Sequence, residues 1–179
     1  AGWYADNTDG AGIVHDLMQN LGVALAGSDV LVLGAGGAAR GILMPLFAQQ
    51  PRSVTICNRT TTRAEALATT FAARGPVRAA SPAALAGTDF DVVINATSAG
   101  LGTDVDPPWP AGLFRPQAFA YDMIYGDVDT AFLRWARAHG ATRRADGLGM
   151  LVEQAAESFL LWRGVRPDTR PVFAMLRPR

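Results

Sequence analysis

Residues 34–40, which read GAGGAAR, are the part of this chain best suited to bind a phosphate. They follow a short apolar run at 30–33 and precede a helix-favouring run at 38–50. The sequence therefore predicts a buried strand, a glycine turn and a helix in succession. Gly34 permits a tight turn, and Gly36 lets a pyrophosphate approach the backbone because it has no Cβ. The free N–H groups at the start of the helix then face the anion.

This arrangement is one half of a dinucleotide site, and the alternative is a plain glycine-rich turn. The spacing G-x-G-x-x-A is a weak signal by itself, but its position between a strand and a helix favours the dinucleotide interpretation. Ala39 takes the third small position, where helix and strand pack closely. The predicted contacts in this loop are Gly34, Ala35, Gly36, Gly37 and Ala38.

A second polar group follows the next predicted strand, at 53–57. NAD-preferring sites usually carry an Asp or Glu there, which accepts from the ribose 2′-hydroxyl. This chain instead has Asn58, Arg59 and Thr60, with Arg63 one turn later. A guanidinium binds phosphate in a bidentate manner, and each charge-assisted contact is worth roughly 1.5–3 kcal/mol. The sequence thus predicts a preference for NADP. The alternative is that the arginines are solvated and Asn58 caps a helix.

Other polar residues carry weaker signals. Asp9 precedes the first helical pattern, where it or Thr8 is expected to cap the helix. A Tyr at a strand end, such as Tyr125, typically packs its ring and leaves its hydroxyl in water. A Gln on a helix, such as Gln154, is typically on the surface, and a Met such as Met123 is typically in the core. By themselves these residues support no specific chemistry.

The single cysteine excludes an internal disulfide and a thiolate cluster for zinc. Cys57 ends an apolar run, so it is predicted to be a small core residue rather than a nucleophile. His15 and His139 have no Ser, Cys or second His at the spacing of a triad or a metal site. No chemistry is assigned to either histidine.

Composition limits the possible partners. The chain has 179 residues, of which 49% are apolar, and its formal net charge is zero. This suits one domain with a sizeable core and no global attraction to nucleic acid or membrane. All 16 basic residues are arginine. With no membrane-length apolar run and no signal peptide, a soluble cytoplasmic protein is expected. The chain begins without Met, which suggests that an upstream part has been removed.

Predicted strands alternate with predicted helices, which indicates an α/β fold with a doubly wound parallel sheet, a Rossmann-like nucleotide-binding domain. We expect residues 1–22 to form an N-terminal segment with an inter-domain helix, and residues 23–179 to form the NADP-binding domain. The predicted strands are 30–33, 53–57, 77–80, 91–95, 119–123 and 141–143, and the later helices are 130–139, 150–162 and 171–176, with a long Pro-rich loop up to residue 110. Every polar motif then lies at the carboxyl ends of the strands.

Six motifs in this order resemble the shikimate dehydrogenases, from residue 7 to nearly the end of the chain. They are 7–10 (NTDG), 34–40 (GAGGAAR), 58–60 (NRT) with Arg63, 95–98 (NATS), 121–125 (YDMIY), and 146–152 (DGLGMLV) followed by Gln154. Any one of them is unspecific, but the ordered set is highly specific.

The resemblance implies a reversible, NADPH-dependent reduction of 3-dehydroshikimate to shikimate in aromatic amino-acid biosynthesis. It implies that the glycine loop binds pyrophosphate and that residues 58–60 with Arg63 hold the 2′-phosphate side. It adds Thr97 to the cofactor contacts and places Met123 and Gly147 at the nicotinamide. The residues that it assigns to the substrate are Asp9, Tyr125 and Gln154, with Asp9 as half of a catalytic Lys–Asp pair.

The chain departs from the family in one respect. The family places an α/β domain before Asn7, and that domain carries the lysine and most shikimate contacts. Because this chain has no lysine, we expect it to bind NADP but to turn over little substrate. The face left by such a domain is expected to promote weak self-association. The alternatives are a quinate/shikimate dehydrogenase, a glutamyl-tRNA reductase-like protein and a non-catalytic nucleotide-sensing domain.

Overall fold

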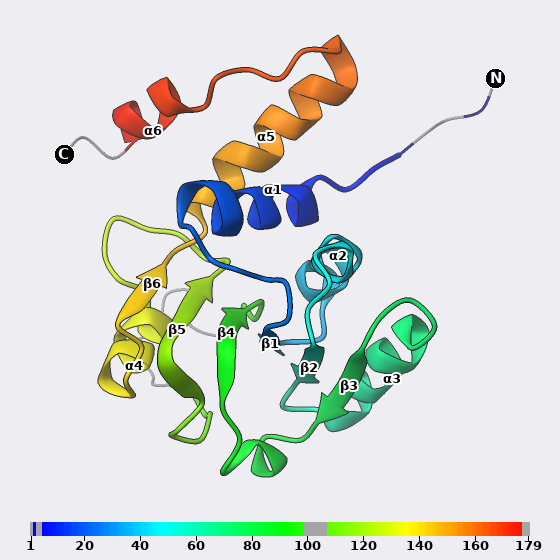
Figure 1. The fold of residues 1–179 in the computed structure, drawn as a ribbon, viewed down its shortest axis with the longest axis vertical. Coiled ribbons are helices and arrows are strands. Elements are labelled where there is room, and N and C mark those ends of the chain that lie inside the picture. Colours follow the sequence, from blue (N-terminus) through cyan, green and yellow to red (C-terminus); the bar gives the residue numbers. More distant parts are fainter. Residues whose placement is uncertain (1, 3–4, 99–106, 177–179) are drawn as a thin grey trace.

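The protein is described by a computed structural model that covers residues 2, 5–98 and 107–176. Within these residues, six parallel strands form one sheet in the order β3-β2-β1-β4-β5-β6 (Figure 1). The order reverses between β1 and β4, which is the switch point of the doubly wound nucleotide-binding fold. The predicted fold class is confirmed. The strands are β1 (Asp29–Leu33), β2 (Ser53–Cys57), β3 (Val77–Ala80), β4 (Phe90–Asn95), β5 (Phe114–Asp122) and β6 (Arg143–Ala145).

Helices cover both faces of the sheet. The helices are α1 (Asp9–His15), α2 (Gly37–Ala48), α3 (Thr61–Phe71), α4 (Ala131–Ala138), α5 (Leu148–Arg163) and α6 (Arg170–Leu176). Helices α1, α2 and α3 share one core cluster with one face of the sheet, and α4 packs in a second cluster on the other face. Figure 1 shows α1 lying between the sheet and α5, while α5 and α6 extend away from the sheet.

Strand β1 is apolar on both sides because both faces of the sheet are covered. Val30 and Val32 pack in the cluster of α2, and Leu31 and Leu33 pack in the cluster of α4. Each side chain buried in this way stabilises the fold by about 1.5–3 kcal/mol. The uninterrupted apolar run 30–33 therefore marked a central parallel strand correctly.

Cys57 is a core residue, as predicted. Its side chain at the end of β2 is fully buried. Burial raises the pKa of the Cys57 thiol to about 11, so the thiolate form is scarce at neutral pH. The structure thus gives Cys57 a packing role.

Two strands differ from their predicted bounds by more than one residue. Strand β5 begins at Phe114 rather than at residue 119, with a register irregularity opposite β4 between Phe90 and Val92. Strand β6 spans Arg143–Ala145 rather than 141–143, because Phe119–Tyr121 of β5 pair with that stretch. Ala141 instead follows the end of α4, and its N–H donates to the Ala136 carbonyl of that helix.

The first helical pattern does not form one regular helix. Helix α1 ends at His15 and continues as a π-helical turn, Asp16–Asn20. Thr8 occupies the cap position, but its hydroxyl donates to Gln154 Oε1 instead of accepting a helix N–H. The Asp9 N–H is bound by the side chain of Asn7, at 2.9 Å. The expected capping by Thr8 or Asp9 is therefore wrong.

Glycines let α1 and α5 cross at close range. A Cβ at Gly12 would lie 2.7 Å from the Gln154 backbone nitrogen, and one at Gly149 would overlap the carboxyl oxygens of Asp16. Backbone of one helix therefore lies directly against the other. This crossing brings the first turn of α5 to the π-helical turn that follows α1.

Of the predicted Pro-rich loop, residues 99–106 lie outside the described residues. None of the helices within 2, 5–98 and 107–176 combines the length and apolarity that a membrane crossing requires.

We predict that Gly149→Ala lowers the free energy of unfolding by about 1–3 kcal/mol, because its Cβ overlaps the Asp16 carboxyl in a closely packed crossing. Urea denaturation followed by circular dichroism measures this. Gly126→Ala is the matched control: its nearest neighbour would be Val128 O at 3.7 Å, so a change within about 0.5 kcal/mol is expected. Equal stability of both variants would contradict the crossing.

Candidate functional site

The turn after β1 is held in a conformation that requires glycine. Gly34 has φ +112°, and a Cβ there would lie 2.8 Å from the Ala96 carbonyl oxygen. Its N–H donates to the Cys57 carbonyl at 2.7 Å, so the turn is attached to the end of β2. The predicted role of Gly34 in a tight turn agrees with this geometry.

The start of α2 presents an open surface that suits an anion. Gly36 is the cap residue, and the first helical bond runs from Arg40 N to Gly36 O at 3.0 Å. Gly36, Gly37 and Ala38 are exposed, and a Cβ added to either glycine would meet nothing within 4 Å. Ala35 is half-buried beside them. The first-turn N–H groups, which have no carbonyl partner within the helix, therefore face open space.

Arginines follow β2 where an acidic residue would favour NAD. Arg59 and Arg63 are exposed, and among the described residues neither forms an ion pair. The Asn58 amide donates to the Thr60 carbonyl at 3.0 Å, and α3 has no side-chain cap. Asn58 therefore does not cap α3, which removes one part of the alternative interpretation. Two guanidinium groups remain available to an anionic ligand.

Buried hydrogen bonds join the ends of β4 and β5. Asn95 donates to Asp122 Oδ1 at 2.9 Å and accepts from the Thr97 hydroxyl at 2.7 Å. Thr130, which caps α4, donates to Asp122 Oδ2 at 2.5 Å. Burial raises the pKa of Asp122. The backbone N–H of Met123 donates to the Asn95 carbonyl at 3.0 Å. This network sets the positions of Thr97 and Met123.

Asp122 lies within the motif 121–125, but neither Asp122 nor Thr130 was among the predicted site residues. A signal was present, because an Asp that directly follows an apolar strand must be hydrogen-bonded if it is buried. Its partner Thr130 is distant in sequence from Asn95, so only the fold brings the three side chains together.

Met123 and Gly147 are neighbours, as a common role at the nicotinamide requires. A Cβ at Gly147 would overlap the Met123 carbonyl oxygen, and the Gly147 N–H donates to the Ile124 carbonyl at 3.0 Å. Gly34 and Thr97 are also adjacent, since a Cβ at Gly34 would lie 3.2 Å from Thr97 Cγ2. The predicted cofactor residues thus gather at the carboxyl ends of β1, β2, β4 and β5.

Fewer contacts join the three residues assigned to the substrate than join the predicted cofactor residues. Asp9 is in the first turn of α1, and Gln154 of α5 accepts from the neighbouring Thr8 hydroxyl at 3.1 Å. Tyr125 is 52% exposed after β5 and lines a hollow with Asp146. Within the described part of the chain, no hydrogen bond joins Tyr125 to Asp9 or Gln154.

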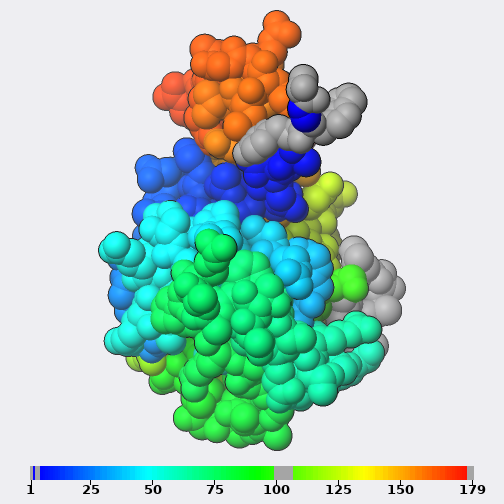
Figure 2. Space-filling view, turned by 90° about the vertical axis from the view of Figure 1, so that its right-hand side faces the viewer, coloured from blue at the N-terminus to red at the C-terminus, as the bar shows by residue number. Residues whose placement is uncertain are grey.

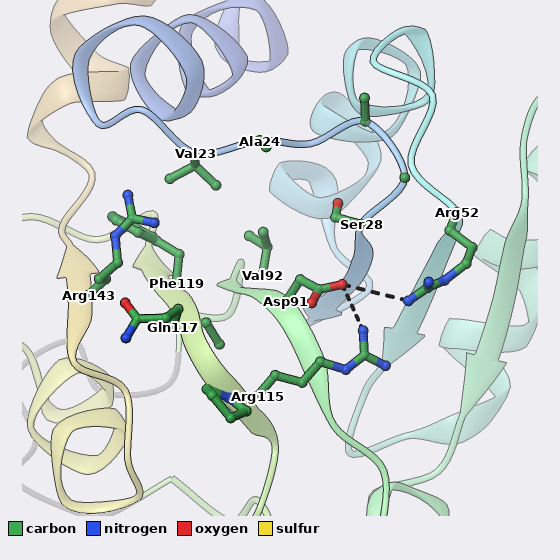
Figure 3. A pocket seen from close by; sticks show the side chains of 14 residues that line it. Val23, Ala24, Ser28, Arg52, Asp91, Val92, Arg115, Gln117, Phe119 and Arg143 are labelled. Carbon is green, nitrogen blue, oxygen red and sulfur yellow. Dashed lines mark hydrogen bonds and ion pairs between the residues drawn. The ribbon is translucent and has the colours of Figure 1, made fainter.

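A hollow of about 540 Å³ lies at the opposite, amino-terminal edge of the sheet. Figure 3 shows Asp91 between Arg52 and Arg115 in this hollow, and Arg115 also pairs with Asp29 at 2.8 Å. The hydrogen bond from Arg52 holds the pKa of Asp29 well below its usual value. Opposite charges therefore balance there. None of the predicted site residues lines this hollow.

No group of three or more His, Cys, Asp or Glu side chains within residues 2, 5–98 and 107–176 is arranged to hold a metal ion.

Comparison with protein families identifies two matching regions. Residues 16–102 match the model of shikimate/quinate 5-dehydrogenases, and residues 147–172 match that of the shikimate 5′-dehydrogenase C-terminal domain. Together the two regions cover more than half of the chain, and they include the glycine loop, Arg59 and Gly147.

Individual proteins agree with the family models. The chain is 61% identical, over 173 residues, to the shikimate dehydrogenase (NADP(+)) of Thioalkalivibrio sulfidiphilus, covering 97% of this chain and 63% of that protein. It superposes on the Ael1 enzyme from Pseudomonas putida with a TM-score of 0.89 and 47% identity, covering 98% and 64% of the two chains.

A second structure is the shikimate 5-dehydrogenase of Thermus thermophilus in complex with NADP(H) and shikimate, with a TM-score of 0.78, 37% identity and coverage of 92% and 59%. The chain thus spans a little under two thirds of the length of the curated relatives that it matches. By its motifs, its strand order and these matches, the chain belongs to the shikimate dehydrogenase family.

Proposed function

We propose that this chain binds NADP(H) at the carboxyl ends of β1, β2 and β4, as part of an enzyme that interconverts 3-dehydroshikimate and shikimate in aromatic amino-acid biosynthesis. The observation that carries the proposal is the pair Arg59 and Arg63, exposed and without an ion pair among the described residues, after the same strand whose Cys57 carbonyl holds the glycine turn. A 2′-phosphate supplies the negative charge that this pair lacks.

The shape of the glycine loop supports the cofactor assignment. The exposed backbone of Gly36, Gly37 and Ala38 fits a pyrophosphate, with Gly34 and Ala35 forming the turn. Asn58 and Thr60 complete the 2′-phosphate side with the arginines. Thr97, Met123 and Gly147 line the nicotinamide side. When bound, NADPH supplies the hydride, and the protein positions the ring.

Asp9, Tyr125 and Gln154 are the proposed substrate residues. Asp9 manages the proton on the substrate oxygen, a role that requires hydrogen-bond reach to that oxygen. Thr8, which precedes Asp9, is hydrogen-bonded to Gln154, and this supports a shared ligand for Asp9 and Gln154 at the α1–α5 crossing. The relative from Thermus thermophilus was solved with NADP(H) and shikimate. We propose shikimate rather than quinate because the curated relatives cited above are shikimate dehydrogenases.

The 179-residue chain by itself is proposed to be a binding unit with little or no turnover. It contains no lysine, whereas the proposed chemistry pairs Asp9 with a lysine. The matched relatives are longer than this chain. In this proposal residues 23–179 are the NADP-binding domain, and residues 1–22 form the segment and helix that join it to a substrate domain. We further propose that the enzyme works in the cytoplasm.

Weak self-association is proposed through the apolar surface of α5 and α6. The exposed large side chains there are Leu151, Phe159, Leu161, Trp162, Val172, Met175 and Leu176, with Val165 between the helices. Figure 2 shows this region projecting from the rest of the molecule. Apolar surface gathered in this way favours association.

We predict that the chain binds NADP more tightly than NAD, and that Arg59→Ala or Arg63→Ala removes most of the difference. Each variant should lose about tenfold to a hundredfold in NADP affinity, the value of one charge-assisted contact. Calorimetric titration of both cofactors measures this. Arg74→Ala, which removes an exposed arginine beyond the end of α3, should change neither affinity. Equal wild-type affinities for NADP and NAD would refute the assignment.

We predict no measurable shikimate-dependent reduction of NADP by the 179-residue chain. The expected absorbance change at the reduced nicotinamide band is zero above background, although NADP binds in the same buffer. A complete family member provides the positive control. Turnover by this chain near that of the control would show that the lysine is dispensable.

We predict concentration-dependent association in analytical ultracentrifugation, weakened by Trp162→Glu. This side chain is 80% exposed on α5, so the charge disrupts an interface without disturbing the core. Met44→Glu places the same charge on an exposed residue of α2 and should leave association unchanged. A monomer at every accessible concentration argues against the proposed surface.

A further inference from the structure

The hydroxyl of Tyr121 joins three elements that are distant in sequence. Tyr121 lies in β5 and is fully buried. Its oxygen accepts from the Met150 N–H at 3.1 Å, and its O–H donates to Asp16 Oδ2 at 2.7 Å. One side chain thus links the sheet, the first turn of α5 and the π-helical turn after α1.

The bond to Met150 helps fix the start of α5. The first-turn N–H groups of a helix have no partner within it. Asp146 accepts from Leu148 N at 3.2 Å, and the Tyr121 hydroxyl accepts from Met150 N. The helix therefore follows its cap residue Gly147 with its first turn held against β5. Gly147 in turn lies directly against the Met123 carbonyl.

The bond to Asp16 fixes the hydroxyl itself. Asp16 is buried, and it also accepts from Asn20 at 2.9 Å. Because Gly149 has no side chain, it leaves the space that the Asp16 carboxyl occupies against α5. The loss of a hydrogen bond to a buried carboxyl costs free energy. The contact with Asp16 therefore keeps the Tyr121 O–H pointed at that carboxyl and the lone pair of the hydroxyl oxygen toward Met150.

We infer that Tyr121, oriented by Asp16, is a positioning residue for the nicotinamide half of the cofactor site. It acts through the Gly147 turn and Met123 and does not itself contact the cofactor. This inference rests on the proposed NADP site. The adenosine half depends on the glycine loop and the arginines, which Tyr121 does not hold.

The test compares two ligands on the 179-residue chain. Tyr121→Phe keeps the ring and removes the hydroxyl. It should weaken NADPH binding by about fivefold to tenfold, the scale of one lost hydrogen bond. It should also reduce the change in nicotinamide fluorescence that accompanies NADPH binding. Binding of adenosine 2′,5′-bisphosphate, which lacks the nicotinamide, should stay unchanged.

Ser28→Ala is the control for a general loss of stability. It removes another buried hydroxyl, which donates to the Leu25 carbonyl at 2.6 Å at the amino edge of the sheet (Figure 3). Both ligands should bind this variant as they bind the wild type. Asp16→Ala is a second variant, and it leaves β5 intact. It should show the same pattern as Tyr121→Phe with smaller amplitude. It tests the inference if Tyr121→Phe does not fold.

The outcomes separate the inference from the proposed function. Wild-type NADPH affinity and nicotinamide fluorescence in Tyr121→Phe, or in Asp16→Ala where only that variant folds, would overturn the inference. Equal weakening of both ligands would overturn it as well, because the effect is then global. A wild-type chain that binds neither ligand would refute the proposed NADP site, and the inference with it.

Discussion

Parallel pairing of β1 with both β2 and β4 is the constraint on which the proposed cofactor contacts depend. Strands of a parallel sheet end at one edge, so the segments that follow them meet there. Because β2 and β4 lie on opposite sides of β1, the residues after these two strands flank the glycine turn. Gly34 shows how tightly the turn is held, since it bonds the Cys57 carbonyl and lies against Ala96. The meeting of these segments follows from strand order before any side chain is considered.

The crossing of α1 and α5 depends instead on buried polar groups. Asp16 and Glu153 are both buried, and Asn20 donates to each of them. Burial raises the pKa of Asp16, more than its hydrogen bonds lower it. Burial also acts to raise the pKa of Glu153, but hydrogen bonds, led by the one from Asn20, hold that pKa below its usual value. The contact between α1 and α5 therefore requires one specific geometry, because each buried carboxyl must keep its hydrogen-bond donors.

Local pattern predicted most of the sheet and the residues at the strand ends. The apolar run at 30–33, the glycine turn and the helix after it appear in the structure as expected, and Cys57 is in the core. The position of β6 was predicted two residues too early, since pairing with β5 rather than local sequence selects Arg143–Ala145. The π-helical turn Asp16–Asn20 was also missed. Its apolar spacing is indistinguishable from that of a regular helix over so short a stretch.

The sequence alone determined the type of fold, the glycine turn after β1 and the arginines that stand in place of an acidic residue after β2, because each is a signal carried by neighbouring residues. The tertiary structure decided which distant side chains meet. Asn95, Asp122 and Thr130 form one network, and Tyr121 joins Asp16 to Met150. Such contacts depend on strand order and on the close approach of helices at Gly12 and Gly149, and neither is encoded in the spacing of any single motif.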